Sequence, residues 1–365
     1  MTMDILLTAV IPLLMLLAVF PGSRKDTEGA FFFGKEYTRT LKGLCAVVVM
    51  MVHVPEHLGN PLQDAMGSFA FVAVTCFFLV SAYGMHYSLT HKEDYLRHFW
   101  RNRLSSLLVP QLLVNVFFCI VYGVLFLLDG PLDAPGASVL MHLDVYVLLL
   151  LLYCVLFYIL ALLFGNAGKK GRFIRDLLLV VVVTASSLAA YFMSSGNDSF
   201  QLNMWPYERM GLVWGLLLFA FFPLVCDFFK RGRLTKILTA ALLCLLCGFL
   251  YLKFKHVFFW GEYMIKLLLG VLLVSFLFLL SQGQVFSNAL SRFLGDISYE
   301  MYLLHPVMFF ILASVLPSMR SGLFILLSFA CTILFAYLIH IVAARFTALL
   351  RSDKKCQLKN STAPS

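Results

Sequence analysis

The residues best suited to chemistry lie on one apolar stretch near the amino-terminal end. Arg39 and Lys42 precede ten residues without a charge, and His53, Pro55 and His57 follow. The apolar run has no period-two alternation and is too long for a buried strand, so it predicts a helix. At about 1.5 Å per residue, that helix separates Lys42 from His53 by roughly 16 Å. An ionisable residue in a membrane span is costly, which makes His53 a functional candidate. The alternative is that His53 only forms a hydrogen bond to a neighbouring helix.

We expect no metal site in this sequence. His53 and His57 are four residues apart, a spacing that suits a metal ion, but Pro55 distorts the turn between them and no third ligand is evident. The nine cysteines lie mostly within apolar stretches. We therefore interpret Cys244 and Cys247 as small residues packed between helices.

A second polar group lies on an apolar stretch near the carboxyl-terminal end. Ser298, Tyr302 and His305 follow the spacing i, i+4, i+7, which places them on one face of a helix. A polar stripe on a membrane-spanning helix should face the interior of the bundle rather than lipid. We expect Tyr302 and His305 to do so.

Two further clusters flank apolar stretches. A basic and aromatic segment contains Arg101 and Arg103 and ends in Pro110. We interpret it as a topology anchor that contacts anionic lipid, and a phosphate site built from arginines is the alternative. Glu208 and Arg209 follow a Trp-Pro-Tyr sequence, where aromatic side chains favour the membrane surface. That pair is a candidate for the lining of an outward-facing polar cavity.

The composition predicts an all-α, polytopic membrane protein. Hydrophobic residues make up 61% of the 365 residues and charged residues only 13%, which excludes an ordinary soluble domain. The net charge of +9 indicates cationic cytoplasmic loops rather than nucleic-acid binding. We predict about eleven spans and interpret the first as a span rather than a cleaved signal peptide. They cover residues 4–22, 41–57, 67–89, 104–128, 142–164, 176–193, 209–228, 237–252, 263–281, 297–316 and 321–349.

The positive charges predict an orientation. Most of the 28 Lys and Arg residues fall in alternate loops, which places the amino terminus outside and the carboxyl terminus in the cytoplasm of a cell membrane. We expect an extra span with a cytoplasmic linker over 1–36, a ten-helix membrane domain over 37–350, and a disordered cytoplasmic tail over 351–365.

Together these stretches resemble the membrane acyltransferase-3 family. The matching elements are a cation and glycine before a helix that ends in histidine, a Phe-Phe-x-x-Ser element, a basic segment ending in proline, an arginine followed by glycine, and a Gly-Ile-Ser-Tyr, Tyr-Leu-x-His element. In this sequence they are Lys42 to His53, Phe77 to Ala82, Arg101 to Pro110, Arg209 to Gly215, and Gly295 to His305. Ala82 replaces a glycine, Lys42 an arginine, and Ser106 a second arginine.

The resemblance implies transfer of an acyl group, usually acetyl, from acyl-coenzyme A to a hydroxyl, most often of a carbohydrate. Imidazole suits the general base that such a hydroxyl needs, so we expect His53 to be catalytic. A covalent acyl-histidine relay stays open. The donor phosphates would be held by Arg39, Lys42, Arg101 and Arg103, and the acceptor path would be lined by Glu208, Arg209, Tyr302 and His305.

A different class of protein also fits many spans with polar residues inside them. A transporter or flippase for lipid-linked sugars would have the same composition, but it would favour two related halves or interrupted helices in matching positions. We find neither pattern in the sequence.

Overall fold

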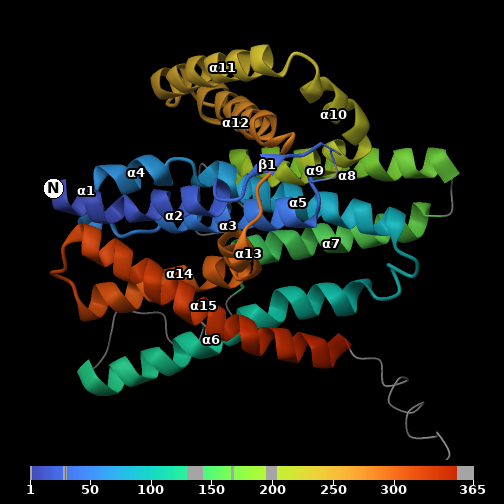
Figure 1. The fold of residues 1–365 in the computed structure, drawn as a ribbon. Helices are drawn as coiled ribbons and strands as arrows, with labels where there is room; N and C mark the ends of the chain where they lie inside the picture. The colour runs from blue at the N-terminus through green and yellow to red at the C-terminus, as the bar shows by residue number, and fades with distance from the viewer. Residues whose placement is uncertain are drawn as a thin grey trace, which may run out of the picture.

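The computed structural model describes residues 2–27, 29, 31–129, 143–165, 168–194 and 204–351. In these ranges the chain is almost entirely helical, as Figure 1 shows. The α-helices are α1 (Thr2–Thr8), α2 (Val10–Val19), α3 (Lys35–Val52), α4 (Pro61–Gly67), α5 (Ala70–His91), α6 (Phe99–Asp129), α7 (Val145–Phe164), α8 (Gly168–Ser194), α9 (Gly211–Ala220), α10 (Phe222–Lys230), α11 (Arg233–Phe254), α12 (Lys266–Ser281), α13 (Ala289–Asp296), α14 (Ser298–Val315) and α15 (Ser321–Arg351). Two short strands, β1 (Arg24–Lys25) and β2 (Gln284–Val285), pair antiparallel.

The predicted all-α membrane bundle is confirmed. Nine helices or helix pairs of the described ranges are long and apolar enough to span a membrane. A tenth span would be the pair Glu208–Ala220 and Phe222–Lys230, which is bent by 82°. The prediction of one continuous span over 209–228 is therefore wrong. Pro223 lacks the N–H that would continue the helix and disfavours helical geometry in the residue before it, which accounts for the break.

The predicted span over 41–57 also differs from the structure. The helix α3 runs from Lys35 to Val52, and the separate 3₁₀ helix η1 covers Glu56–Leu58. Pro55 lies between the two and is incompatible with a continuous helix. Charged residues occupy the first half of α3, and this helix is not one of the nine apolar spans. His53 consequently stands at the carboxyl end of a helix rather than within one.

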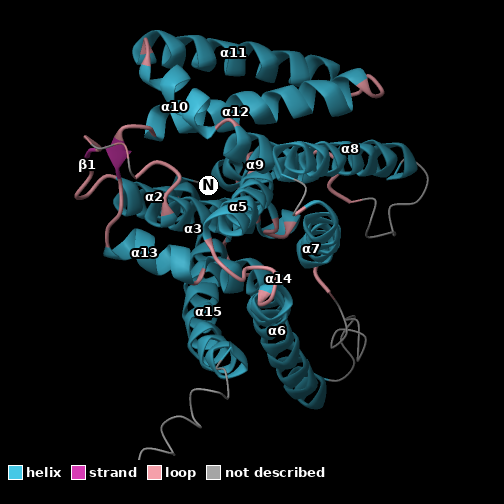
Figure 2. Cartoon of the chain, turned by 90° about the vertical axis from the view of Figure 1, so that its right-hand side faces the viewer, coloured by secondary structure: helices cyan, strands magenta, loops and turns pink. Residues whose placement is uncertain are grey.

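Close backbone approaches through glycine hold the centre of the bundle together. Helix α5 packs against α3, α9 and α12, and Figure 2 shows it among the inner helices. A Cβ atom on Gly211 would lie 2.3 Å from the carbonyl oxygen of Thr75, and one on Gly215 would lie 2.2 Å from that of Leu79. Only glycine permits such contact, and the four-residue spacing is the small-residue pattern of membrane helix pairs. The same Gly215 packs against the methyl group of Ala82.

The connections between the long helices gather at two ends of the bundle. In Figure 1 the amino terminus and the turn between α14 and α15 lie at one end of the bundle, on the left. The ends of α5 and α7 and the starts of α6 and α8 lie at the other end, on the right. Helices α11 and α12 form a separate pair above the rest in both views, and α11 is mostly exposed.

Thiol labelling tests this orientation. In a cysteine-free background, Lys170→Cys should resist a membrane-impermeant thiol reagent in intact cells, while Ser318→Cys should react, because we expect the α8 end of the bundle to be cytoplasmic. Both positions are exposed, so burial does not explain a difference. Labelling of Lys170→Cys alone would overturn the orientation and, with it, a cytoplasmic donor site beside α6.

Candidate active site

Two glycines bring the helix that carries His53 onto the segment that leads to His305. A Cβ atom on Gly43 would lie 2.9 Å from the backbone nitrogen of Gly295, and one on Gly295 would lie 2.4 Å from the carbonyl oxygen of Arg39. Helices α3 and α13 therefore touch backbone to backbone. Helix α14 begins directly after α13 and also packs against α3. The glycine of each predicted motif thus fixes the position of the histidine that follows it.

His53 presents one ring nitrogen that is free to act as a base. Its Nδ1 lies 2.9 Å from the carbonyl oxygen of Val49, one turn back on α3. A carbonyl oxygen only accepts, so Nδ1 carries the proton and the neutral ring keeps its lone pair on Nε2. The residue is exposed at the end of the helix. A hydroxyl group that approaches this end therefore meets a proton acceptor.

His305 faces His53 from α14. The two ring centroids are 4.7 Å apart, with the rings edge to face. His305 is buried, and its Nδ1 lies 3.3 Å from the carbonyl oxygen of Met301. Its Nε2 is buried without a hydrogen-bond partner. An unpaired buried acceptor costs free energy, commonly about 1–3 kcal/mol, unless a donor reaches it. The pair thus offers two imidazole lone pairs in one place.

Tyr302 and Asp144 extend this centre. The Tyr302 hydroxyl donates to the Asp144 carboxylate at 2.8 Å, and the same oxygen accepts the backbone N–H of Tyr146 at 2.8 Å, where it caps α7. The Tyr302 ring lies 6.0 Å from that of His305. Sequence reasoning predicted Tyr302 but missed Asp144. The available signal was an acidic residue directly before a long apolar run, which is typical of a helix N-cap.

The predicted polar stripe on α14 does face the bundle interior. Ser298, Tyr302 and His305 are all buried. The Ser298 hydroxyl donates to the carbonyl oxygen of Gly295 at 2.8 Å, so it closes the turn between α13 and α14. The three members of the stripe thus have different partners: His305 lies against the ring of His53, and Tyr302 lies beside His305.

The cations of α3 lie among carboxylates. The Arg39 guanidinium is 2.8 Å from Asp296 on α13 and 3.1 Å from Glu36 on its own helix. Lys42 is half-buried and lies within electrostatic range of Asp296 and Glu300. The ion pair between Arg39 and Asp296 ties α3 to α13. It also neutralises the positive charge of Arg39, which we predicted from the sequence to bind donor phosphates.

The arginines of α6 lie close to aromatic and imidazole side chains. Arg101 contacts His98 at 3.2 Å, and Arg103 donates to the Tyr95 hydroxyl at 3.3 Å with its guanidinium 5.9 Å from the Phe99 ring centre. Burial raises the pKa of the Tyr95 phenol, although Arg103 acts in the opposite direction. Tyr95 therefore stays neutral near pH 7, and the positive charge of Arg103 is not balanced by a phenolate.

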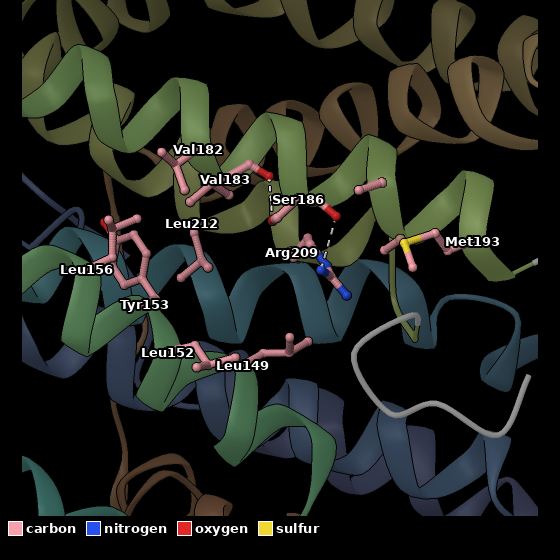
Figure 3. Close-up of a pocket in the computed structure, with 12 residues that line it drawn as sticks. Leu149, Leu152, Tyr153, Leu156, Val182, Val183, Ser186, Met193, Arg209 and Leu212 are labelled. Atoms are coloured by element: carbon pink, nitrogen blue, oxygen red, sulfur yellow. Dashed lines mark hydrogen bonds between the residues drawn. The ribbon is translucent and has the colours of Figure 1, made fainter.

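Glu208 and Arg209 belong to a different part of the bundle from the histidine pair. Both are buried on the 3₁₀ helix η4 (Glu208–Met210). Arg209 donates to the carbonyl oxygens of Trp205 at 3.2 Å and Ser186 at 3.3 Å, so it joins η4 to α8. It also lines a cavity of about 380 Å³ between α7, α8 and α9. Figure 3 shows Arg209 beside Ser186 with apolar side chains around them. That cavity is mainly apolar, in contrast to the polar cavity predicted there.

Comparison with known proteins decides the family. A family model described as an acyltransferase domain matches residues 36–341. The chain belongs to the acyltransferase-3 family. Its fold and membership make it a multi-pass membrane acyltransferase, as the order of its motifs indicated. No curated protein and no solved structure matches the chain.

The acyltransferase-3 match includes every element that suggested the family. The matched range begins just before Arg39 and ends after His305. The histidine pair, the arginines of α6, and Glu208 with Arg209 all lie within it. The first two helices, α1 and α2, precede it.

Proposed function

We propose that the protein transfers an acyl group, with acetyl as the expected group, from acyl-coenzyme A to a hydroxyl of a carbohydrate or glycolipid. The observation that carries the proposal is the pair of facing imidazoles, His53 and His305, 4.7 Å apart. Each ring has its Nδ1 at a backbone carbonyl, which leaves both Nε2 lone pairs for the reaction.

His53 serves as the base in this scheme. The acceptor hydroxyl gives its proton to Nε2 of His53 while its oxygen bonds to the thioester carbonyl carbon. The C–S bond then breaks, and the departing sulfur takes the proton back from the imidazolium. The products are an ester and a free thiol, and His53 returns to its neutral form. An acyl-histidine intermediate on the same nitrogen is the covalent version of this scheme.

The acceptor reaches the pair past Tyr302, whose hydroxyl is already held by Asp144. His305 then accepts a hydrogen bond from the acceptor, which its unpaired Nε2 favours. Glu208 and Arg209 lie in a different part of the bundle and would contact only a part of the acceptor that is remote from the histidine pair. Entry from outside, with the donor in the cytoplasm, makes the reaction a transmembrane acylation.

The donor phosphates are best assigned to Arg101 and Arg103. A guanidinium binds phosphate oxygens through parallel N–H groups, and the Arg103 guanidinium donates to a neutral phenol, that of Tyr95. Arg39 contributes less, because Asp296 and Glu36 pair with it. Lys42 lies one helix length from His53, roughly 16 Å away by helical rise. It would contact the donor between its phosphates and its thioester.

Replacing Arg103 with lysine tests the donor assignment. We expect the Michaelis constant for acetyl-coenzyme A to rise about 10-fold, because an ammonium keeps the charge but cannot make two parallel hydrogen bonds to phosphate. The turnover number at saturating donor should change much less. If Arg103→Lys and Arg103→Ala both keep the wild-type constant, Arg103 is a topology anchor only.

The chemical nature of the product tests the function itself. The proposal predicts that label from acetyl-coenzyme A enters a product that hydroxylamine cleaves, because esters react and amides resist. A labelled product that survives this treatment would contradict O-acylation. Movement of a lipid-linked sugar across the membrane without any label would favour a flippase instead.

A further inference from the structure

The carboxyl end of α15 is fastened to the amino end of α6. Arg351 donates from Nε to the Ser105 hydroxyl at 3.0 Å and from Nη2 to the carbonyl oxygen of Asn102 at 2.9 Å. One turn earlier, Thr347 donates to the carbonyl oxygen of Ser105 at 3.2 Å. Figure 1 shows the start of α6 and the end of α15 on the same side of the bundle. Arg351 is thus held beside the basic segment although it lies 248 positions after Arg103 in the sequence.

This attachment gathers positive charge. Arg101 and Arg103 both lie within electrostatic range of Arg351. The structure pairs neither Arg103 nor Arg351 with a carboxylate of the residues it describes. Their acceptors are a phenol, a hydroxyl and a carbonyl, all neutral. Like charges held together without a counter-ion repel one another, and an anion between them relieves that repulsion.

Arg351 also retains donors for such an anion. A guanidinium has five N–H groups in one plane, and the two hydrogen bonds to α6 use two of them. The remaining groups keep a fixed direction because the other edge of the plane is anchored to Ser105 and Asn102. A planar, pre-positioned guanidinium is suited to phosphate oxygens, which accept two parallel hydrogen bonds.

We propose that Arg103 and Arg351 form one phosphate-binding site between α6 and α15. The ligand class is a phosphate ester or diphosphate. If the ligand comes from the donor substrate, which rests on the proposed function, it is the nucleotide part of acyl-coenzyme A. A phospholipid headgroup carries the same chemistry and is distinguished by experiment. Residue 106, one turn after Arg103, is a serine, and its hydroxyl donates to the carbonyl oxygen of Arg103 at 3.0 Å. Helix α6 therefore has no second arginine at this position, and in our proposal Arg351 of α15 supplies the second guanidinium.

The test uses the full chain in nanodiscs of zwitterionic lipid. Titration calorimetry measures the affinity for acetyl-coenzyme A and for inorganic pyrophosphate. We expect Arg351→Ala to weaken both about 10-fold, as the loss of a hydrogen bond to a charged group predicts, and Arg351→Lys to weaken them less. The matched control is Arg345→Ala, which removes the same charge from an exposed position of the same helix and should change neither affinity.

A second measurement identifies the source of the phosphate. Native mass spectrometry of wild type and Arg351→Ala, prepared with anionic phospholipid, shows whether Arg351 retains a lipid. Unchanged affinities for both soluble probes together with loss of a bound lipid would assign the site to a headgroup and overturn the nucleotide source. Unchanged affinities without loss of lipid would overturn the phosphate site altogether.

Failure of this site and failure of the proposed function give different results. The binding measurements need no turnover. If acetyl-coenzyme A binds in an Arg351-dependent way but is never consumed, the phosphate site stands and the acyl-transfer proposal falls. If Arg351→Ala consumes acetyl-coenzyme A with wild-type affinity, acyl transfer stands and the site falls.

Discussion

Replacing His53 with glutamine should lower the rate of acyl transfer about 10²–10⁴-fold, which is the usual contribution of a general base. Glutamine still forms hydrogen bonds at the end of α3, but its amide takes no proton near neutral pH. His53 is exposed, so the substitution should leave the free energy of unfolding within about 0.5 kcal/mol of wild type. The measurement is the steady-state rate at saturating donor, with thermal unfolding of the same sample.

His57→Gln is the matched control for His53. It makes the same chemical change four residues along the chain, on the 3₁₀ helix η1, where the side chain is also exposed. Pro55 separates the two positions, and of the two histidines it is His53 whose ring lies against His305. We expect its rate to stay near that of wild type. Equal rates for His53→Gln and wild type would reduce His53 to a packing residue and make His305 the next candidate base.

His305→Phe should lower activity without lowering stability. Phenylalanine keeps a ring between Tyr302 and Phe309 but removes the buried, unpaired Nε2. Because an unpaired buried polar atom is destabilising, its removal should leave the unfolding temperature unchanged or raise it. Loss of the neighbouring lone pair should still lower the rate of acyl transfer by about 10²-fold, the lower end of general acid–base effects.

Opposite signs for activity and stability identify a group kept for function rather than for packing. The two quantities are measured on the same preparation, by acyl transfer at saturating donor and by thermal unfolding. A less stable variant with wild-type turnover would make His305 a structural residue. In that case His53 would act without it.

Sequence patterns predicted the helices and the residues that stand at their ends. The spacing of Ser298, Tyr302 and His305 predicted a buried stripe, and all three side chains are buried. Periodicity and hydropathy depend on local sequence, so they predict helices and the buried face of each helix. The seventh span was wrong for a local reason too, since Pro223 marked the break.

Tertiary partners could not be predicted in the same way. Nothing near Arg39 in the sequence indicates that Asp296 neutralises it, and nothing near Arg103 indicates Arg351. These contacts depend on how helices far apart in the chain pack, and for Arg39 and Asp296 the close approach of Gly43 and Gly295 decides that packing. The predicted tail at 351–365 lies, except for Arg351, outside the described residues.

The most direct test of the central claim is the release of free thiol from acetyl-coenzyme A by the purified protein in nanodiscs. A thiol reagent that changes absorbance follows the reaction, with and without a cell-envelope extract that contains hydroxyl acceptors. We predict release that depends on the extract, because acyl transfer needs a hydroxyl to proceed. No thiol release above the rate without protein, whatever the acceptor, would contradict the account.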